Sequence, residues 1–336
     1  LFGILRDHDQ PDSARFRAGM ALGEFAPHDK SWNSTDFSFL TRQMLEASRD
    51  DQRDVRDYLR PLKDQLLRPL DLAFHDAKER MSIRLAAADA LADLASDDVP
   101  GLAILASDAM PEQYAPLMAA LLEKETTDEM RATLIQLMQL EPPREVKIAE
   151  RTTLDRRRAG AAITLLRLGF VSDALPVLRV NGDPEAATRF IHGLRDRGVP
   201  VQTISDAIGG ESSNGVLYGL LLALGEYQPN DLSPQAFSEL RRHVVNWYAN
   251  DPRSAIHGAA GWLLRHWGMR AEAERVDHTT LPWDAAKMSE WFVEKVGEDY
   301  FTFIVFMPGE FMMGSDTGEP FHRANEARHR VQITRP

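Results

Sequence analysis

Hydrophobic positions between residues 1 and 270 recur at helical spacing, and many of them follow a short run of small residues. An arginine or another polar residue heads each run, and leucines or other apolar residues come after it. The copies are residues 17–22 (RAGMAL), 84–91 (RLAAADAL), 131–134 (RATL), 158–163 (RAGAAI) and 257–264 (HGAAGWLL). Small residues let neighbouring helices approach closely, and the apolar residues supply the stripe that each helix buries. The pattern therefore predicts a series of amphipathic helices.

Segments rich in Asp, Pro and Gly separate these helical units, as at 97–101 (DDVPG), 141–143 (EPP) and 181–184 (NGDP). The units recur at irregular periods of about 30–45 residues, a spacing typical of HEAT and armadillo repeats. Each unit would bury its apolar stripe by stacking on the next one. We therefore predict a mainly α protein in which residues 1–270 form a HEAT/armadillo-like α-solenoid without a β-sheet.

Prolines and glycines mark several expected helix boundaries. Pro234 suits the first turn of a helix that continues to Trp247, because proline lacks the N–H that is unpaired there in any case. Gly268 suits the C-terminal end of the next helix. Pro61 and Pro69 are expected to divide residues 58–74 into short or kinked helices.

Residues 291–315 change from helical to strand chemistry. Trp291–Glu294 and Tyr300–Phe306 are rich in aromatic and β-branched residues and flank a turn that contains Gly297, so we expect them to form a hairpin. Glu310–Met313 is expected to add a short strand. Because a two-stranded piece is marginal by itself, we interpret this segment as the truncated first part of a second domain.

These patterns give an expected domain organisation in three parts. Residues 1–270 are the helical-repeat region, 271–288 a linker, and 289–336 the truncated β segment. Since the chain also begins with Leu1 rather than methionine, we interpret it as an internal fragment of a longer protein.

Composition narrows the possible partners and chemistry. The chain is 43% hydrophobic and 27% charged, which is typical of a globular protein, and its formal net charge is −12. That charge disfavours nucleic acid and anionic membranes as partners, because both attract clustered positive charge. No apolar run reaches the roughly 18 residues that a membrane span needs. The sequence has no cysteine, which excludes disulfides, thiolate nucleophiles and iron–sulfur sites and fits a cytoplasmic location.

Two groups of histidines invite a ligand-binding interpretation. His322 and His329 flank a polar loop that contains three carboxylates (Asp316, Glu319 and Glu326), but their spacing matches no helical ligand pair. A solvated loop is the better interpretation. His257 and His266 lie near Trp262 and Trp267, where an aromatic cage could be drawn. Large aromatic residues at helical spacing are usually core residues, so we expect both tryptophans, with Leu263, to be buried against the preceding helix.

Charged and glycine-rich stretches offer two further candidates. Arg156-Arg157-Arg158 could bind phosphate, but an exposed charged helix face accounts for it better. Gly209-Gly210 and Gly314 lack the strand, helix and lysine of a phosphate-binding loop, so we interpret them as turns. The sequence therefore assigns no catalytic residue, no cofactor-binding residue and no metal ligand, and it implies no cofactor.

Two parts of the chain carry a resemblance to a known family. The first comprises Asp251-Pro252, Ile256–Ala260 and Trp262–Gly268, together with looser matches at Arg15–Phe25, Leu59–Leu62, Ser107–Tyr114 and Leu220–Tyr227. It is similar to the HEAT-like middle region of large bacterial serine/threonine protein kinases. The second comprises Phe306–Ser315 and Asn325–Val331. It resembles the beginning of the formylglycine-generating-enzyme-like (sulfatase-modifying-factor) domain found in such proteins.

The resemblance carries over no catalytic residue. The kinase signatures do not occur in this sequence, and the family's active-site cysteines would lie beyond Pro336. We therefore expect a non-catalytic scaffold of a multidomain bacterial signalling protein, which binds a protein or peptide on the solenoid surface and is not itself an enzyme. The alternative is the front end of a formylglycine-generating-enzyme-like domain protein. Cysteines in the following part of the full-length protein would favour that alternative.

Overall fold

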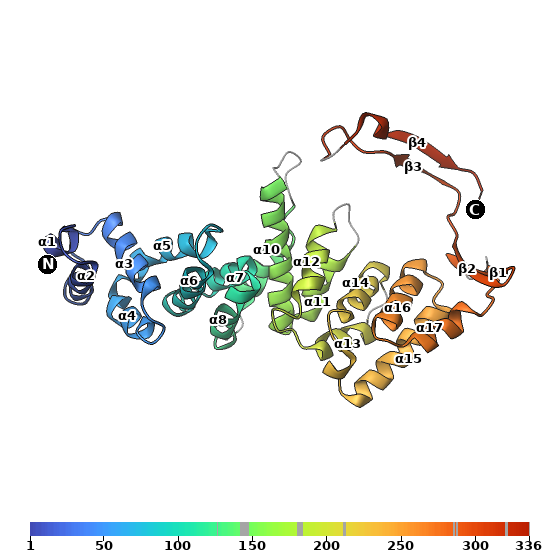
Figure 1. The fold of residues 1–336 in the computed structure, drawn as a ribbon, viewed down its shortest axis with the longest axis horizontal. Coiled ribbons are helices and arrows are strands. Elements are labelled where there is room, and N and C mark those ends of the chain that lie inside the picture. Colours follow the sequence, from blue (N-terminus) through green and yellow to red (C-terminus); the bar gives the residue numbers. More distant parts are fainter. Residues whose placement is uncertain are drawn as a thin grey trace. The chain divides into compact units, whose positions relative to one another are not determined.

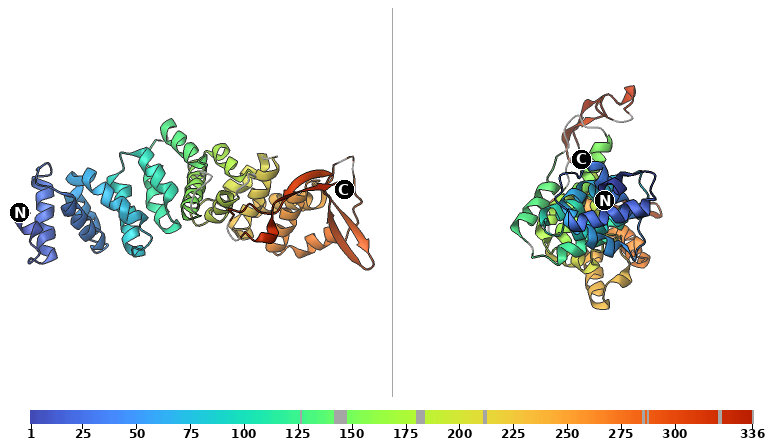
Figure 2. Two further views of the ribbon diagram at one scale, coloured as in Figure 1. Left: turned by 90° about the horizontal axis from the view of Figure 1, so that it is seen from above. Right: turned by 90° about the vertical axis from the view of Figure 1, so that its left-hand side faces the viewer.

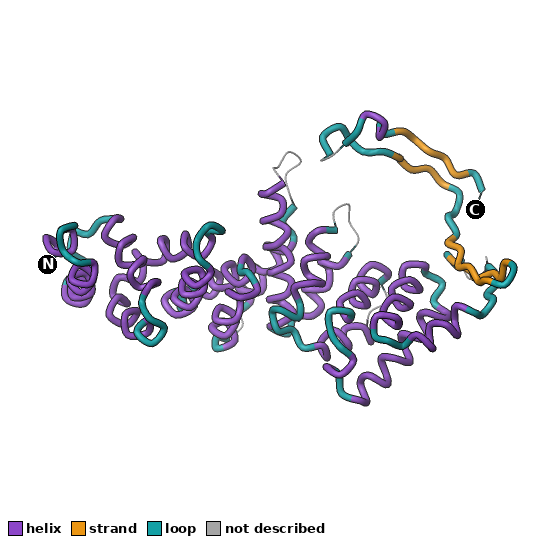
Figure 3. Tube along the Cα trace, in the orientation of Figure 1, coloured by secondary structure: helices purple, strands orange, loops and turns teal. Residues whose placement is uncertain are grey.

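The computed structural model of the chain describes residues 1–125, 127–141, 148–179, 184–210, 213–284, 286, 288–319 and 322–335. The fold is mainly α: a HEAT/armadillo-like α-solenoid is followed by a short β segment (Figure 1, Figure 3). The chain divides into two compact units, Leu1–Pro200 and Val201–Pro336.

The first unit consists of helices. They are α1 Phe2–Arg6, α2 Asp12–Phe25, α3 Ser34–Glu46, α4 Gln52–Leu59, α5 Lys63–His75, α6 Met81–Leu94, α7 Val99–Asp108, α8 Pro111–Leu122, α9 Asp128–Met138, α10 Ile148–Arg167, α11 Val171–Ala174 and α12 Glu185–Gly193, with 3₁₀ turns η1 Arg60–Leu62 and η2 Leu175–Leu178. Helices also pack against the helix two places further on, as α3 does on α5, α6 on α8 and α7 on α9 (Figure 2). This stacking is characteristic of solenoids.

Several small residues of the recurring pattern, among them Gly19, Gly160 and Gly261, lie where another segment approaches closely. Gly160 of α10 faces the backbone of α7, so that a Cβ at this position would overlap the carbonyl oxygen of Ser107. Ala87 and Ala162, in two other positions of the pattern, are fully buried. The prediction of close helix packing through small residues is therefore confirmed.

The two prolines of residues 58–74 behave differently. Pro61 lies in η1, which separates α4 from α5, as expected. Pro69 lies inside α5, and the helix continues through it to His75, so the segment is divided into short helices at Pro61 and not again at Pro69. The buried face of α5, which includes Leu66 and Phe74, packs against α6 and α3, and this burial offsets the hydrogen bond that proline removes.

The second unit contains five further helices and four strands. They are α13 Val201–Gly210, α14 Asn214–Leu224, α15 Pro234–Asn250, α16 Ser254–His266, α17 Arg270–Asp277, β1 Trp291–Val296, β2 Asp299–Ile304, β3 Gly309–Met313 and β4 His329–Ile333, with 3₁₀ turns η3 Pro229–Asp231 and η5 Ala324–Glu326. The predicted start of α15 at Pro234 is confirmed, and Ser233 caps the helix by accepting a hydrogen bond from the N–H of Ala236. Helix α17 occupies the beginning of the stretch 271–288 that was expected to be a linker.

The strands form two separate two-stranded antiparallel sheets. In the first, β1 pairs with β2 around a turn in which Gly297 has a φ of 67°, which confirms the predicted hairpin. In the second, β3 pairs with β4. The sequence predicted a strand at Glu310–Met313 but gave no indication of its partner, because the alternation in β4 covers only Arg330–Ile333.

Trp291 attaches the first hairpin to the helices of its unit. The side chain is 2% exposed, and its indole N–H donates a hydrogen bond of 2.7 Å to the carbonyl of Asp251. The ring stacks on His257 of α16, with 3.6 Å between ring centroids. The imidazole Nδ1 of His257 lies 2.7 Å from the carbonyl oxygen of Tyr248, so strand, loop and two helices meet at one buried point.

Candidate functional site

Helix α15 presents one polar row and one mixed row beside a buried stripe. Leu240, Val244 and Tyr248 are buried at intervals of four residues and fix the rotation of the helix. One row that this rotation leaves outside is Arg241, Val245 and Ala249; the other is Arg242, Asn246 and Asn250. Helix α17, in which Ala273 is buried, packs against α15 and forms the opposite wall of a groove.

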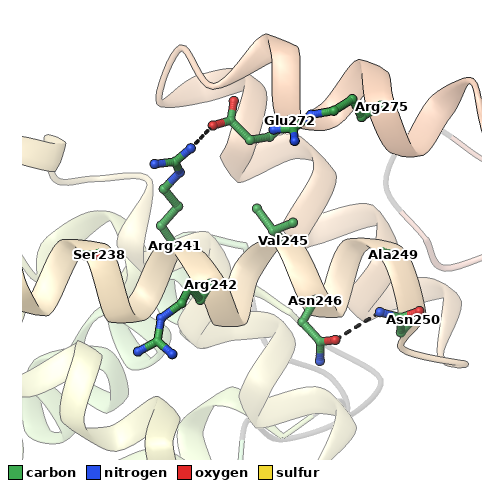
Figure 4. Close-up of a pocket in the computed structure, with 9 residues that line it drawn as sticks. All are labelled: Ser238, Arg241, Arg242, Val245, Asn246, Ala249, Asn250, Glu272 and Arg275. Atoms are coloured by element: carbon green, nitrogen blue, oxygen red, sulfur yellow. Dashed lines mark hydrogen bonds and ion pairs between the residues drawn. The ribbon is translucent and has the colours of Figure 1, made fainter.

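The groove between α15 and α17 has a volume of about 390 Å³ and is open to solvent along its length (Figure 4). Arg241 reaches across to form an ion pair with Glu272 of α17, and Val245 points toward α17. Asn250 donates a hydrogen bond of 2.9 Å from Nδ2 to Oδ1 of Asn246. The groove therefore combines guanidinium groups, side-chain amides and a small apolar floor.

The charges in this groove do not balance. Three arginines line it, and Glu272 is the carboxylate among the lining residues. A hydrogen bond from its own backbone N–H lowers the pKa of Glu272, and the bond from Arg241 adds to the effect, so this carboxylate is ionised. Arg242 and Arg275 form no ion pair in the described ranges of the chain, although the charge of Arg275 also acts on Glu272. The surplus of positive charge suits a negatively charged partner group.

A second groove, of about 400 Å³, lies between α13 and α15. Its lining includes the carboxylates of Asp206 and Glu239 and the rings of His243 and Trp247, whose centroids are 5.7 Å apart. Gln202 donates a hydrogen bond of 2.7 Å to Asp206. The two grooves beside α15 therefore carry opposite charge.

The four aromatic residues that the sequence suggested as a possible cage differ in their burial. Trp267 and His257 are buried, and Trp267 donates a hydrogen bond of 3.0 Å to the carbonyl of Tyr227, which confirms them as core residues. Trp262 is 41% exposed, so the expectation that it is buried is wrong. Its ring instead lies over Gly225 and stacks on His266, with 5.0 Å between centroids.

The three consecutive arginines of α10 do not form an exposed charged face, and that interpretation is also wrong. Arg157 donates two hydrogen bonds, of 2.6 and 2.7 Å, to the buried carboxylate of Asp108. Arg158 pairs with Asp155 at 3.0 Å, and Arg156 is partly buried near Met110. The reason is tertiary: α10 packs against α7, α9 and α12 and is surrounded by helices.

The remaining sequence candidates have structural partners. His322 lies 2.7 Å from the hydroxyl of Ser315, and His329 lies 2.9 Å from the carbonyl oxygen of Ala327. Among the residues that the structure describes, no three His, Asp or Glu side chains are placed to hold a metal ion. Gly314 has a φ of 104° and makes a turn, as expected, whereas Gly209-Gly210 are the last residues of α13 rather than a turn.

Comparison with known proteins gives little beyond the fold. No family model and no curated protein matches the chain. A solved structure of human deoxyhypusine hydroxylase in complex with glycerol matches 79% of this chain and 94% of its own, with 16% identity and a TM-score of 0.26. The expectation that this chain is not an enzyme is contradicted, because the protein matched is an enzyme, and we do not retain it. At this TM-score the likeness assigns no activity or substrate to the chain.

One further finding concerns membranes. Across the described residues, no helix is both long enough and apolar enough to cross a bilayer.

Proposed function

We propose that this chain is a helical-repeat interaction region of a multidomain bacterial signalling protein, a serine/threonine kinase, and that it binds an acidic peptide segment of a partner protein. The groove between α15 and α17 supports the proposal most directly. Arg242 of α15 and Arg275 of α17 line it and form no ion pair in the described chain, and the amides of Asn246 and Asn250 continue the row of Arg242, which points away from α17 (Figure 4).

This arrangement suits an extended peptide. Side-chain amides offer both donors and acceptors to a peptide backbone, and guanidinium groups bind carboxylates in a forked geometry. Solenoid proteins commonly bind segments of this kind along their stacked helices. The proposal includes a cytoplasmic location, with which the cysteine-free sequence is consistent.

The test is fluorescence anisotropy with a short labelled peptide of alternating Glu and Ser. The Arg242→Glu/Arg275→Glu variant is expected to bind this peptide at least about tenfold more weakly, because two attractive charges become repulsive. Arg49→Glu is the matched control, since Arg49 is exposed and lies in the first unit. Equal affinity of the double variant and wild type would contradict the proposal.

A second candidate function is the front end of a formylglycine-generating-enzyme-like domain protein. The observation that favours it is the β3–β4 hairpin, because both of its strands come from the residues that carry the resemblance, Phe306–Ser315 and Asn325–Val331. Extension of the chain to the full-length protein, followed by mass spectrometry of a sulfatase peptide for conversion of cysteine to formylglycine, tests this candidate.

A further inference from the structure

Arginines from three helices gather in the first unit, where α7 ends and α8 begins. Arg84 belongs to α6, Arg156 and Arg157 to α10, and Arg189 to α12. Figure 1 shows α7, α10 and α12 side by side, and α10 packs against both of the others. Burial lowers the pKa of Arg156, the carboxylate of Asp108 acts in the opposite direction, and the positive charges of the other three arginines lower the pKa further, so the four guanidinium groups are electrostatic neighbours.

One of these four arginines is neutralised by a buried carboxylate. Arg157 pairs with Asp108, whose side chain is 3% exposed, and His75 lies 3.4 Å from the same carboxylate. The pair takes up both oxygens of Asp108, and the charge of the same carboxylate also acts on Arg156 without an ion pair between them.

Arg84 is held in place by neutral groups. Its Nε donates a hydrogen bond of 3.3 Å to the carbonyl of Phe74, and its Nη2 donates one of 3.2 Å to the side chain of Gln113. Gln113 is itself buried and bonded to the same carbonyl, at 3.0 Å. These contacts fix the direction of the guanidinium without reducing its charge.

Among these arginines, Arg156 has the fewest hydrogen-bond and ion-pair partners for its positive charge. Its Nη1 lies 3.7 Å from the sulfur of Met110, a weak acceptor, and its buried Nε has no hydrogen-bond partner. No carboxylate of the described ranges lies within ion-pair distance of it. A partly buried cation with a thioether as its neighbour is unfavourable unless a negative group joins it.

Arg189 contributes a fourth charge and a second unpaired donor. It forms an ion pair of 2.7 Å with Glu185, while its Nε is buried without a partner. The side chain is 35% exposed, so part of Arg189 reaches solvent although its Nε is buried. Arg156 also acts electrostatically on Arg197 of the same unit, so the arginines of this region outnumber the carboxylates of Asp108 and Glu185 that pair with them.

We propose that Arg84, Arg156 and Arg189 form a binding site for a phosphate-type oxyanion. A phosphate group carries a charge of about −1.5 to −2 at neutral pH and three acceptor oxygens, which matches the surplus charge and the unpaired N–H donors. Arginine suits this ligand because its planar fork binds phosphate through two parallel hydrogen bonds. Inorganic phosphate and a phosphorylated side chain of a partner share this chemistry.

The first arm of the test measures thermal unfolding and calorimetric binding with inorganic phosphate, against chloride at the same ionic strength. Phosphate is expected to raise the melting temperature of the wild-type chain beyond the effect of chloride. Arg156→Met is expected to weaken phosphate binding by about tenfold, the loss of one charge-assisted hydrogen bond. Arg68→Gln is the matched control, because Arg68 is exposed on α5 of the same unit, and it is expected to bind phosphate like the wild type.

The Arg156→Met variant also shows whether folding is affected. Without phosphate its melting temperature is expected to equal or exceed that of the wild type, since the substitution removes an uncompensated cation. If it unfolds at lower temperature, Arg189→Gln replaces it, because this position is more exposed and the same loss of phosphate binding is expected there.

The second arm distinguishes the two sources of phosphate. A phosphoserine peptide and its unphosphorylated form are titrated in the same way. If the phosphoserine peptide binds more tightly than inorganic phosphate, the ligand is a phosphorylated partner. If the phosphoserine peptide and inorganic phosphate bind equally well, the ligand is the free anion. The proposal is overturned if phosphate stabilises the wild type no more than chloride does, or if Arg156→Met and Arg189→Gln both retain the full effect.

Discussion

Asp108 at the end of α7 and Arg157 in α10 form a two-pronged ion pair across 49 residues of chain. The carboxylate is 3% exposed and the guanidinium 35% exposed, so the pair is buried on one side and reaches solvent on the other. It joins α7 to α10 at the position where the arginine cluster begins. Its removal would leave a partly buried arginine without its partner.

Asp108→Asn is therefore expected to destabilise the chain. Breaking a buried pair by removing one partner leaves the other charge uncompensated, and we expect a loss of about 2–3 kcal/mol because Arg157 retains some contact with water. Urea unfolding measures this free energy. Asp50→Asn, at an exposed position, removes the same charge and is expected to leave the unfolding free energy nearly unchanged.

The stability contributed by His75 is expected to depend on pH. The hydrogen bond to Asp108 raises the pKa of His75 above its ordinary value of 6.5, against the effect of burial. A raised folded-state pKa means that the contribution is complete below pH 6.5 and is lost as the pH rises through the raised pKa. Burial acts to raise the pKa of Asp108, but its bonds from His75 and Arg157 hold it below its ordinary value, so this carboxylate stays ionised there.

Urea unfolding of wild type and His75→Gln across about pH 5 to 9 measures this effect. The difference in unfolding free energy between the two proteins should be largest at acidic pH and should shrink as the pH rises. A difference that stays constant over the whole range would show that His75 does not gain stability from the carboxylate.

Tryptophan substitutions provide a comparison between a buried and a half-exposed ring of the same unit. Trp291→Ala removes a fully packed side chain and is expected to reduce the unfolding free energy by about 3–5 kcal/mol. Trp262→Ala removes a ring that is 41% exposed, and we expect a smaller loss, of about 1–2 kcal/mol. Chemical denaturation of both variants checks the order, and a larger loss for Trp262→Ala would contradict the packing seen here.

Two glycines of the recurring small-residue pattern should respond to alanine in opposite directions. Gly160→Ala forces a Cβ against the backbone of Ser107 and is expected to cost about 1–3 kcal/mol. Gly258→Ala meets no atom within 4 Å and removes backbone freedom in the helical segment α16, so a gain of about 0.5–1 kcal/mol is expected. Melting temperatures of the two variants, measured against wild type, should shift in opposite directions.

Part of the candidate groove could be read from the sequence. The buried stripe of α15 follows from its period, and this places Arg242, Asn246 and Asn250 on a common exposed row. The opposite wall could not be read in this way. It is formed by α17, whose short and highly charged sequence was expected to begin a linker, and α17 contributes a wall because it packs on α15.

The sequence by itself determined the helical class, the start of α15 at Pro234 and the β1–β2 hairpin, because these depend on residues close together along the chain. Tertiary structure alone decided that α5 continues through Pro69, that β3 pairs with β4, and that Trp262 is exposed while Arg157 is partly buried. Each of these outcomes depends on which segment, distant in the sequence, packs against the residue or strand concerned. Local periodicity shows that one face of an element is apolar or charged. Only the packing of the whole unit determines whether a backbone, a ring or a carboxylate covers that face.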